Sequence, residues 1–265
     1  MRNIILLFLF LSLNNIFAQT KKKTTSTVKK ENKEYFDIEK YKDWEIDNDH
    51  STKENYKFLK RGSERVEIDF SEDAIKLSLK NINSPYEFVK VFSNSTKRLF
   101  GEAIYFYQFP IGIDKDYDEN GKLIKEMNND KLYKFSVQKL IQKFKKEYHV
   151  DLEDFKLENY VERFESEELK GKAFYGVGLV SEENKNKTRY YLIDGTTGKL
   201  LYKTFYYRRE GRSPFYEYQI KLDNREIPDK YLLTFKGKDY TRNEWDAYER
   251  AFYKKYKGTK KITDP

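Results

Sequence analysis

The sequence predicts an α+β protein in which antiparallel strands predominate, and three observations lead to this expectation. Several short segments alternate apolar and polar residues, which is typical of strands with one buried face. Two longer segments place apolar residues three and four positions apart, which is typical of amphipathic helices. Aromatic residues make up 17% of the 265-residue chain. Because disordered chains are poor in such residues, we expect a folded body even though 36% of the residues are charged.

Residues 1–18 have the pattern of a secretory signal peptide. Arg2 precedes an apolar run at residues 4–13, and Ala18 supplies the small residue of the expected cleavage site. The run is too short to cross a bilayer, and the chain has no cysteine that could carry a lipid anchor or form a disulfide. We therefore expect an exported, soluble protein, periplasmic or secreted, with no transmembrane segment. Residues 19–34 are expected to form a basic, flexible linker.

The formal net charge of +8 is concentrated at the two ends of the chain. Residues 1–33 hold seven basic groups and one acid, and residues 249–265 hold six basic groups and two acids, which leaves residues 34–248 with a net charge of −2. A nucleic-acid-binding domain carries its basic patch on the fold, so we expect no nucleic-acid partner. The basic ends could instead contact an anionic envelope surface.

Residues 35–131 are expected to form an antiparallel β module with one apolar face. In segment 65–70, Val66, Ile68 and Phe70 alternate with charged residues. Segments 74–80, 86–93 and 102–109 continue the strand pattern.

Segment 116–127, DYDENGKLIKEM, partly matches a calcium-binding loop. Such a loop needs a bidentate carboxylate at its twelfth position and a helix on each side. The twelfth residue is Met127, and an aromatic strand pattern precedes the segment. A second Gly-Lys-Leu sequence follows Asp194, with Gly198 in the place of Gly121. Both stretches predict a hairpin turn whose glycine has a positive φ, and we expect no metal ion.

Segment 109–126 resembles the MORN-like repeats of bacterial antitoxin-type proteins. The resemblance depends on the spacing of Gly112, Tyr117, Asn120, Gly121 and Leu123. Asp114 stands where that motif usually has tryptophan, and a generic aromatic hairpin fits the same residues.

Residues 132–210 are expected to form a second module that begins with a helix. Val137, Leu140, Ile141 and Phe144 share one face of this helix, and Ser136 is its expected N-cap. Strand patterns follow at residues 155–164, 172–180, 188–194 and 199–207.

This order of elements over residues 132–207 resembles a PepSY-like domain. In that family a strand ending in aspartate leads through a Thr-Gly turn into the last strand, as Asp194, Thr197 and Gly198 do here. The resemblance implies an exported module, related to peptidase propeptides, that binds or restrains other proteins without catalysis.

Residues 211–265 are expected to contain a strand at 215–222, an aromatic C-terminal helix and a basic tail. The helix should begin at Thr241, with Glu244 completing a capping box. One face carries an aromatic stripe, which could belong to the core or dock on a partner. The candidate partner-binding residues are Trp245, Tyr248, Phe252 and Tyr256.

The familiar catalytic patterns are missing from the sequence. It has no cysteine, no Gly-x-Ser-x-Gly elbow, no HExxH motif and no glycine-rich phosphate loop. Asp47, Asp49 and His50 could offer metal ligands, although neighbours in a loop more often form a turn or a helix cap. His149 follows a lysine-rich helix, where an imidazole complements the helix dipole. We therefore expect no catalytic, cofactor-binding or metal-binding residues.

Together these patterns predict an exported, non-enzymatic protein that acts by protein–protein binding, with an immunity or inhibitor-like role. Two other classes remain open. One is an envelope-associated structural protein held by its basic ends, and the other is a hydrolase that uses carboxylates around His50.

We expect the mature protein to begin at Gln19, because Ala18 is placed where signal peptidase requires a small residue. Mass spectrometry of the protein recovered outside the cytoplasm checks this expectation. A mature chain that still carries Met1 would contradict it.

Overall fold

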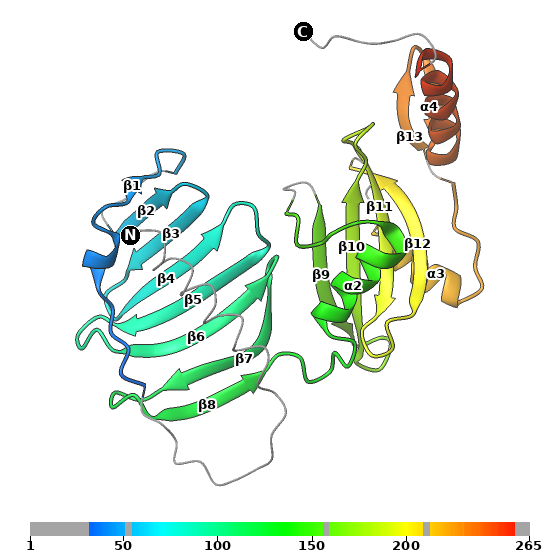
Figure 1. The fold of residues 1–265 in the computed structure, drawn as a ribbon. Coiled ribbons are helices and arrows are strands. Elements are labelled where there is room, and N and C mark those ends of the chain that lie inside the picture. The colour runs from blue at the N-terminus through cyan, green and yellow to red at the C-terminus, as the bar shows by residue number, and fades with distance from the viewer. Residues whose placement is uncertain (1–31, 51–54, 156–158, 209–212, 230, 258–265) are drawn as a thin grey trace.

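The computed structural model describes residues 32–50, 55–155, 159–208, 213–229 and 231–257. This part of the chain folds into an eight-stranded sheet, a four-stranded sheet, a two-stranded hairpin and three α-helices, with antiparallel pairing throughout (Figure 1). The predicted fold class is thereby confirmed. The predicted signal peptide, most of the predicted linker and the last eight residues lie outside the described ranges. Within those ranges, no helix is both long enough and apolar enough to cross a membrane.

The first sheet is an antiparallel meander in which each strand pairs with its neighbours in the sequence (Figure 1). Its strands are β1 (Glu45–Ile46), β2 (Tyr56–Arg61), β3 (Glu64–Phe70), β4 (Ala74–Asn81), β5 (Tyr86–Ser93), β6 (Leu99–Phe106), β7 (Phe109–Tyr117) and β8 (Leu123–Asn128). The predicted alternation is confirmed, because Val66, Ile68, Ile75 and Leu77 are at most 5% exposed. The turn between β7 and β8 is the hairpin that the sequence predicts.

The apolar face of this sheet is covered by residues 32–44, which we call the N-terminal strap. The Asn32 N–H donates to the Gly121 carbonyl, and the Phe36 N–H donates to the Lys97 carbonyl. The strap therefore follows the turns at one end of the meander before it reaches the short helix η1 (Ile38–Tyr41). The side chains of Phe36, Ile38, Tyr41 and Trp44 pack on the apolar cluster of the sheet. A single-layered sheet thus obtains a core from the chain that precedes it.

The second sheet follows helix α2 (Val137–Tyr148), whose predicted N-cap is confirmed by a hydrogen bond from the Lys139 N–H to Ser136. Its strands are β9 (Tyr160–Ser166), β10 (Lys172–Val180), β11 (Lys187–Asp194) and β12 (Leu200–Tyr207), in the order β12-β11-β10-β9. Leu140 and Phe144 of α2 are fully buried against one face of this sheet. The predicted helix followed by an antiparallel meander is therefore confirmed.

Residues 215–222 form part of helix α3 (Pro214–Leu222), so the predicted strand is wrong. The Ser213 side chain accepts from the Phe215 N–H, and Pro214 occupies the first turn, where its missing N–H leaves no partner unsatisfied. Glu217 and the adjacent Tyr218 are both buried, which a strand with one buried face would not allow. The segment packs on the face of the second sheet opposite α2, and this packing selects the helix.

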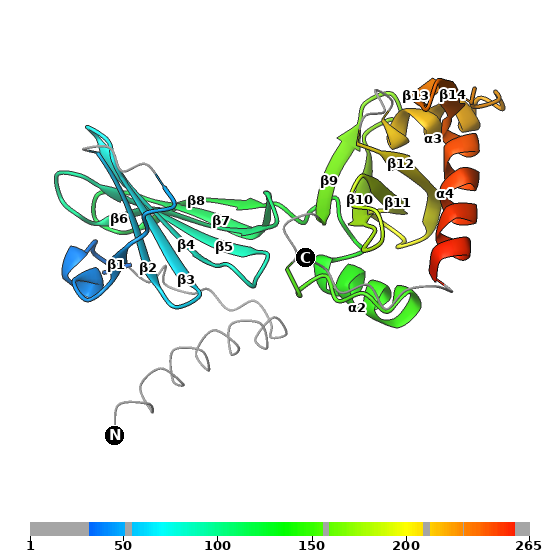
Figure 2. The same ribbon diagram turned by 90° about the horizontal axis from the view of Figure 1, so that it is seen from above.

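The last part of the chain is the C-terminal unit, residues 231–257. It consists of β13 (Tyr231–Phe235), β14 (Lys238–Thr241) and α4 (Arg242–Lys257), and α4 lies at the end of the four-stranded sheet where β11 begins and β12 ends (Figure 1 and Figure 2). The predicted capping box is confirmed in both directions. The Thr241 N–H donates to Glu244 Oε2 at 3.0 Å, and the Glu244 N–H donates to Thr241 Oγ1 at 3.3 Å. The hairpin itself is absent from the sequence prediction.

The two large sheets share a hydrophobic core that centres on the side chain of Arg163. This side chain is 6% exposed, and its guanidinium lies 2.6 Å from Asp130 Oδ1. It also donates to the Pro110 carbonyl and lies over the rings of Phe109 and Tyr133. Because Pro110 and Phe109 belong to the first sheet and Arg163 to the second, this residue ties the two modules together.

We expect Gly121→Ala and Gly198→Ala each to lower the free energy of unfolding by roughly 1–3 kcal/mol. Each substitution forces an alanine into the left-handed region of backbone conformation, which residues with a side chain rarely adopt. Gly121 has a φ of +79° and Gly198 a φ of +75°. An added Cβ would lie 2.1 Å from the Asn32 carbonyl oxygen and 2.3 Å from the Phe135 ring, respectively. Urea unfolding of the full chain measures the effect.

The matched control is Gly101→Ala, whose new Cβ would have its nearest neighbour at 3.5 Å with no positive φ. It should remain within about 0.5 kcal/mol of the wild type. Equal losses in all three variants would mean that the turn geometry is not the cause.

Candidate functional site

The aromatic residues of α4 form a continuous row of rings on one face of the helix. The ring centroids of Trp245 and Tyr248 are 5.2 Å apart, and those of Tyr248 and Phe252 are 6.3 Å apart. Both pairs are nearly parallel, with interplanar angles of 28° and 29°. Tyr256 belongs to α4, but its side chain lies outside what the structure describes. The structure thus brings together three of the four predicted partner-binding residues.

The hairpin of the C-terminal unit covers one end of this aromatic row. Phe235 and Tyr240 each contact both Trp245 and Tyr248, with centroid distances between 5.3 and 5.8 Å. These contacts leave Trp245 and Tyr248 half-buried. Phe252, at the other end of the row, is 45% exposed. The row is therefore covered at its beginning and open to solvent at its end.

A neighbouring face of α4 contacts the four-stranded sheet through polar groups, and the Trp245 indole N–H donates to Glu249 Oε1 of that face at 2.8 Å. Asp246, only 6% exposed, forms an ion pair with Lys187 of β11. Glu249 accepts hydrogen bonds from the Tyr207 hydroxyl at 2.9 Å and from Asn184 Nδ2 at 2.6 Å. A surface helix usually buries its apolar face against the body of the protein. In α4 the aromatic row packs on the hairpin, and polar side chains face the four-stranded sheet.

A buried carboxylate holds the first turn of α4 in this orientation. Glu217 of α3 is 1% exposed, pairs with Arg242 and accepts from the Tyr202 hydroxyl at 3.1 Å. Because an unpaired buried carboxylate is strongly unfavourable, the pair restrains the rotation of α4 about its own axis. The aromatic row consequently points away from the four-stranded sheet.

The residues around His50 are arranged as a charge cluster. The His50 ring stacks on Phe58 at 4.8 Å, and His50 Nε2 lies 4.0 Å from Asp47. Asp47 is 2% exposed and is held by Arg65 at 2.7 Å and Lys60 at 3.7 Å. These two cations occupy the surroundings that a metal ion would need. In the described residues no group of three or more His, Asp or Glu side chains is placed to hold a metal ion.

His149 lies at the end of α2, as the sequence predicts, and it is exposed. Its backbone is left-handed, with a φ of 56°, and its N–H donates to the Phe144 carbonyl. The residue therefore acts as the C-cap of the helix through its backbone.

Two glycines of β10 create a flat region on the sheet face opposite α2. A Cβ at Gly176 would lie 2.4 Å from Glu162 Oε1, and a Cβ at Gly178 would lie 2.0 Å from the Tyr160 ring. The missing side chains therefore allow Tyr160 and Glu162 of the edge strand to lie across the sheet. The Gly-Val-Gly sequence is the only signal of this region, and it does not identify the residues that fill it.

Glu162 is one of several ionisable groups in this network whose pKa is shifted. Its side chain is partly exposed, but its carboxyl lies beside Tyr190, and partial burial raises the pKa of this carboxyl above its ordinary value of 4.5, while the hydrogen bond from Tyr190 opposes the rise. The Tyr190 hydroxyl lies 3.3 Å from Glu162 Oε1. Next to it, the hydroxyls of Tyr206 and Tyr160 are 3.2 Å apart. The partners of these groups lie within the same sheet, which indicates a structural network.

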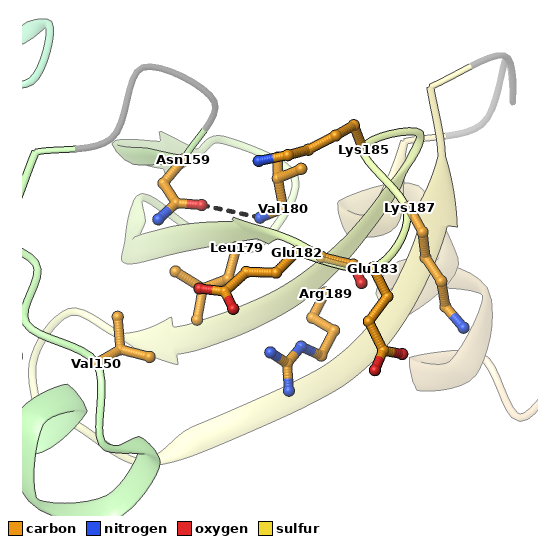
Figure 3. Close-up of a pocket in the computed structure, with 10 residues that line it drawn as sticks. Val150, Asn159, Leu179, Val180, Glu182, Glu183, Lys185, Lys187 and Arg189 are labelled. Carbon is orange, nitrogen blue, oxygen red and sulfur yellow. Dashed lines mark hydrogen bonds between the residues drawn. The ribbon is translucent and has the colours of Figure 1, made fainter. Parts of the chain in front are cut away.

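A cavity of about 810 Å³ opens on the α2 side of the four-stranded sheet (Figure 3). Val150, which follows α2, and Leu179 of β10 supply apolar walls. The β10–β11 turn and the start of β11 supply a charged rim, which consists of Glu182, Glu183, Lys185, Lys187 and Arg189. Sequence reasoning does not identify this cavity, because its walls come from segments separated by a helix, a strand and a turn.

Comparisons of the chain with models of protein families, with curated proteins and with solved structures find no match. The MORN-like and PepSY-like resemblances therefore stay predictions. The argument for a function has to come from the residues themselves.

We expect Glu162→Gln to raise the melting temperature at pH 7 and to leave it unchanged below pH 4.5. A carboxyl whose pKa is raised by folding favours the folded state while it is protonated, and this contribution is lost as the pH rises above 4.5. The glutamine variant keeps the shape and the Tyr190 contact without the charge. Thermal unfolding followed by circular dichroism at both pH values measures the difference.

The control is Glu165→Gln, which changes another exposed glutamate of the same strand, one without the Tyr190 contact. It should melt like the wild type at both pH values. A stabilisation by Glu162→Gln that persists at low pH would show that the charge of Glu162 is not its cause.

Proposed function

We propose that this protein is exported and acts by binding another protein, without catalysis, through the exposed end of the aromatic row on α4. The observation that carries this proposal is the orientation of α4. Its polar residues Asp246 and Glu249 contact the four-stranded sheet, whereas its aromatic row packs on the hairpin and ends in Phe252, which is 45% exposed. A helix placed in this way presents the residue types that dominate the affinity of protein interfaces.

The hairpin, which covers only the first part of the aromatic row, supports the same proposal. A two-stranded hairpin alone is only marginally stable, so the hairpin and α4 stabilise each other through their ring contacts. Phe252 lies beyond the rings of Phe235 and Tyr240, and Tyr231 at the start of the hairpin is 62% exposed. A partner could therefore bury large aromatic surfaces without first unfolding the C-terminal unit.

An immunity or inhibitor-like role is the form of protein binding that we favour. Such a protein works by occupying a surface of its partner, which requires a stable scaffold and an exposed contact face. The shared core around Arg163 provides the scaffold. The MORN-like and PepSY-like resemblances of the sequence point to the same kind of role, and its lack of familiar catalytic motifs agrees with it.

We expect Phe252→Ala to weaken partner binding by about 2 kcal/mol or more and to leave the stability within about 0.5 kcal/mol of the wild type. Trp245→Ala should instead lower the melting temperature, because Trp245 makes edge-to-face ring contacts with both Phe235 and Tyr240. The partner is first captured by a photo-crosslinking amino acid placed at position 252 in the exported protein. Titration of that purified partner with the wild type and both variants then gives the affinities.

The matched control places the same crosslinker at Tyr216, an aromatic residue of α3 that is 50% exposed. A partner that uses the aromatic row should be captured from position 252 and not from position 216. Capture at both positions alike, or unchanged affinity of the Phe252→Ala variant, would contradict the proposal.

A further inference from the structure

The cavity on the α2 side of the four-stranded sheet is bordered by Arg189, an exposed cation that forms no ion pair within the described part of the chain. Arg189 lies in β11, opposite Leu179 of β10 and opposite Phe205 of β12. Directly opposed residues of antiparallel strands share a face, so Arg189 belongs to the face that α2 and the cavity occupy. Figure 3 shows its side chain beneath the turn that carries Glu182 and Glu183.

Neighbouring cations of the same sheet are paired, and Arg189 is not. Lys187, two residues earlier on the same face, forms an ion pair with Asp246. Arg163 of β9 pairs with Asp130. For Arg189, the described part of the chain offers no acid within ion-pair distance and no hydrogen-bond acceptor. Its guanidinium remains available to a group from outside the protein.

The walls of the cavity are already in position for a ligand. The Asn159 side chain accepts a hydrogen bond from the Val180 N–H at 2.9 Å, which ties the start of β9 to the end of β10. On the other side of the turn, the Tyr253 hydroxyl donates to the Glu183 carbonyl at 3.2 Å, and Asn184 donates to Glu249. A rim held from both sides needs little ordering when a ligand binds, which favours affinity.

We propose that this cavity binds a ligand that carries a single carboxylate on an aliphatic group. The guanidinium of Arg189 matches the two oxygens of a carboxylate, and such charge-assisted pairs are the stronger hydrogen bonds of proteins. Val150, which is half-buried, receives the aliphatic part, and Leu179, which is 4% exposed, belongs to the core that supports this wall. Glu182 and Glu183 add negative charge to the rim and so disfavour a ligand with two or more negative charges, such as a phosphate. A volume of about 810 Å³ is in the range of small-molecule sites.

Calorimetric titration of the full chain with matched probes tests the proposal. We expect N-acetyl-leucine to bind with a Kd of about 1 mM or below. N-acetyl-leucinamide, which lacks the charge, should bind at least roughly tenfold more weakly, and inorganic phosphate should not compete. Hexanoate distinguishes the source of the carboxylate. If it binds as tightly as N-acetyl-leucine, the ligand is a simple aliphatic acid, and if it binds more weakly, the ligand is a peptide carboxyl terminus.

Two variants locate the binding in this cavity. Arg189→Gln should reduce the affinity for N-acetyl-leucine to that of the amide, and Val150→Trp should abolish binding by filling the cavity. The control is Arg98→Gln, which removes an arginine that lies over the Tyr35 ring of the first sheet, and it should bind like the wild type. Melting curves confirm that each variant is folded.

The proposal is wrong if neither acid binds at its solubility limit, or if acid and amide bind equally. It is also wrong if the folded Arg189→Gln variant keeps the preference for the acid. None of these measurements uses a protein partner or the residues of α4, so the result is independent of the proposed protein binding.

Discussion

Each sheet of this protein has an apolar face that must be removed from water, and the segments that cover these faces determine the arrangement of the whole chain. On the first sheet, the N-terminal strap lays Phe36 and Trp44 on one apolar cluster, and the second module packs on Phe106 and Phe109. In the second sheet α2 covers one face and α3 the other. Because burial of apolar surface is the main favourable term in folding, these covering segments are part of each core.

The C-terminal unit follows a different principle, and the protein binding that we propose depends on the difference. By the time the chain reaches α4, both faces of the four-stranded sheet carry a helix, and α4 meets polar groups where β11 begins and β12 ends. Lys187 and Tyr207 are therefore met by the polar face of α4. Buried ion pairs add little net stability, but they penalise any orientation that leaves a charge unpaired. This specificity directs the aromatic row outwards.

The same turn supports both surfaces to which we assign binding. The β10–β11 turn forms the rim of the cavity, and its residues Glu183 and Asn184 also contact α4. The cavity opens towards α2, whereas the aromatic row faces the hairpin on the far side of α4. One rigid connection therefore fixes the positions of two chemically different surfaces, one with a cation and apolar walls and one built from stacked rings.

The sequence by itself determined the elements whose signals are local. Alternation predicted strands β3 and β4, the capping residues Ser136 and Thr241 marked the starts of α2 and α4, and Gly121 and Gly198 marked the hairpin turns. In each of these cases the pattern and the structure agree because neighbouring residues supply the interaction. The residues of the aromatic row could also be predicted from the sequence, since a helix brings residues three and four positions apart onto one face.

Only the tertiary structure decided the features that depend on distant residues. Segment 215–222 alternates well enough for a strand, yet the buried pair of Glu217 with Arg242 and the contact with the second sheet make it a helix. The hairpin β13–β14 pairs only within itself in the described ranges, and its strands are too short for a periodic signal. The direction of the aromatic row was likewise undetermined by the sequence. It follows from Asp246 meeting Lys187, a pair separated by 59 residues, and no local pattern encodes a partner at that distance.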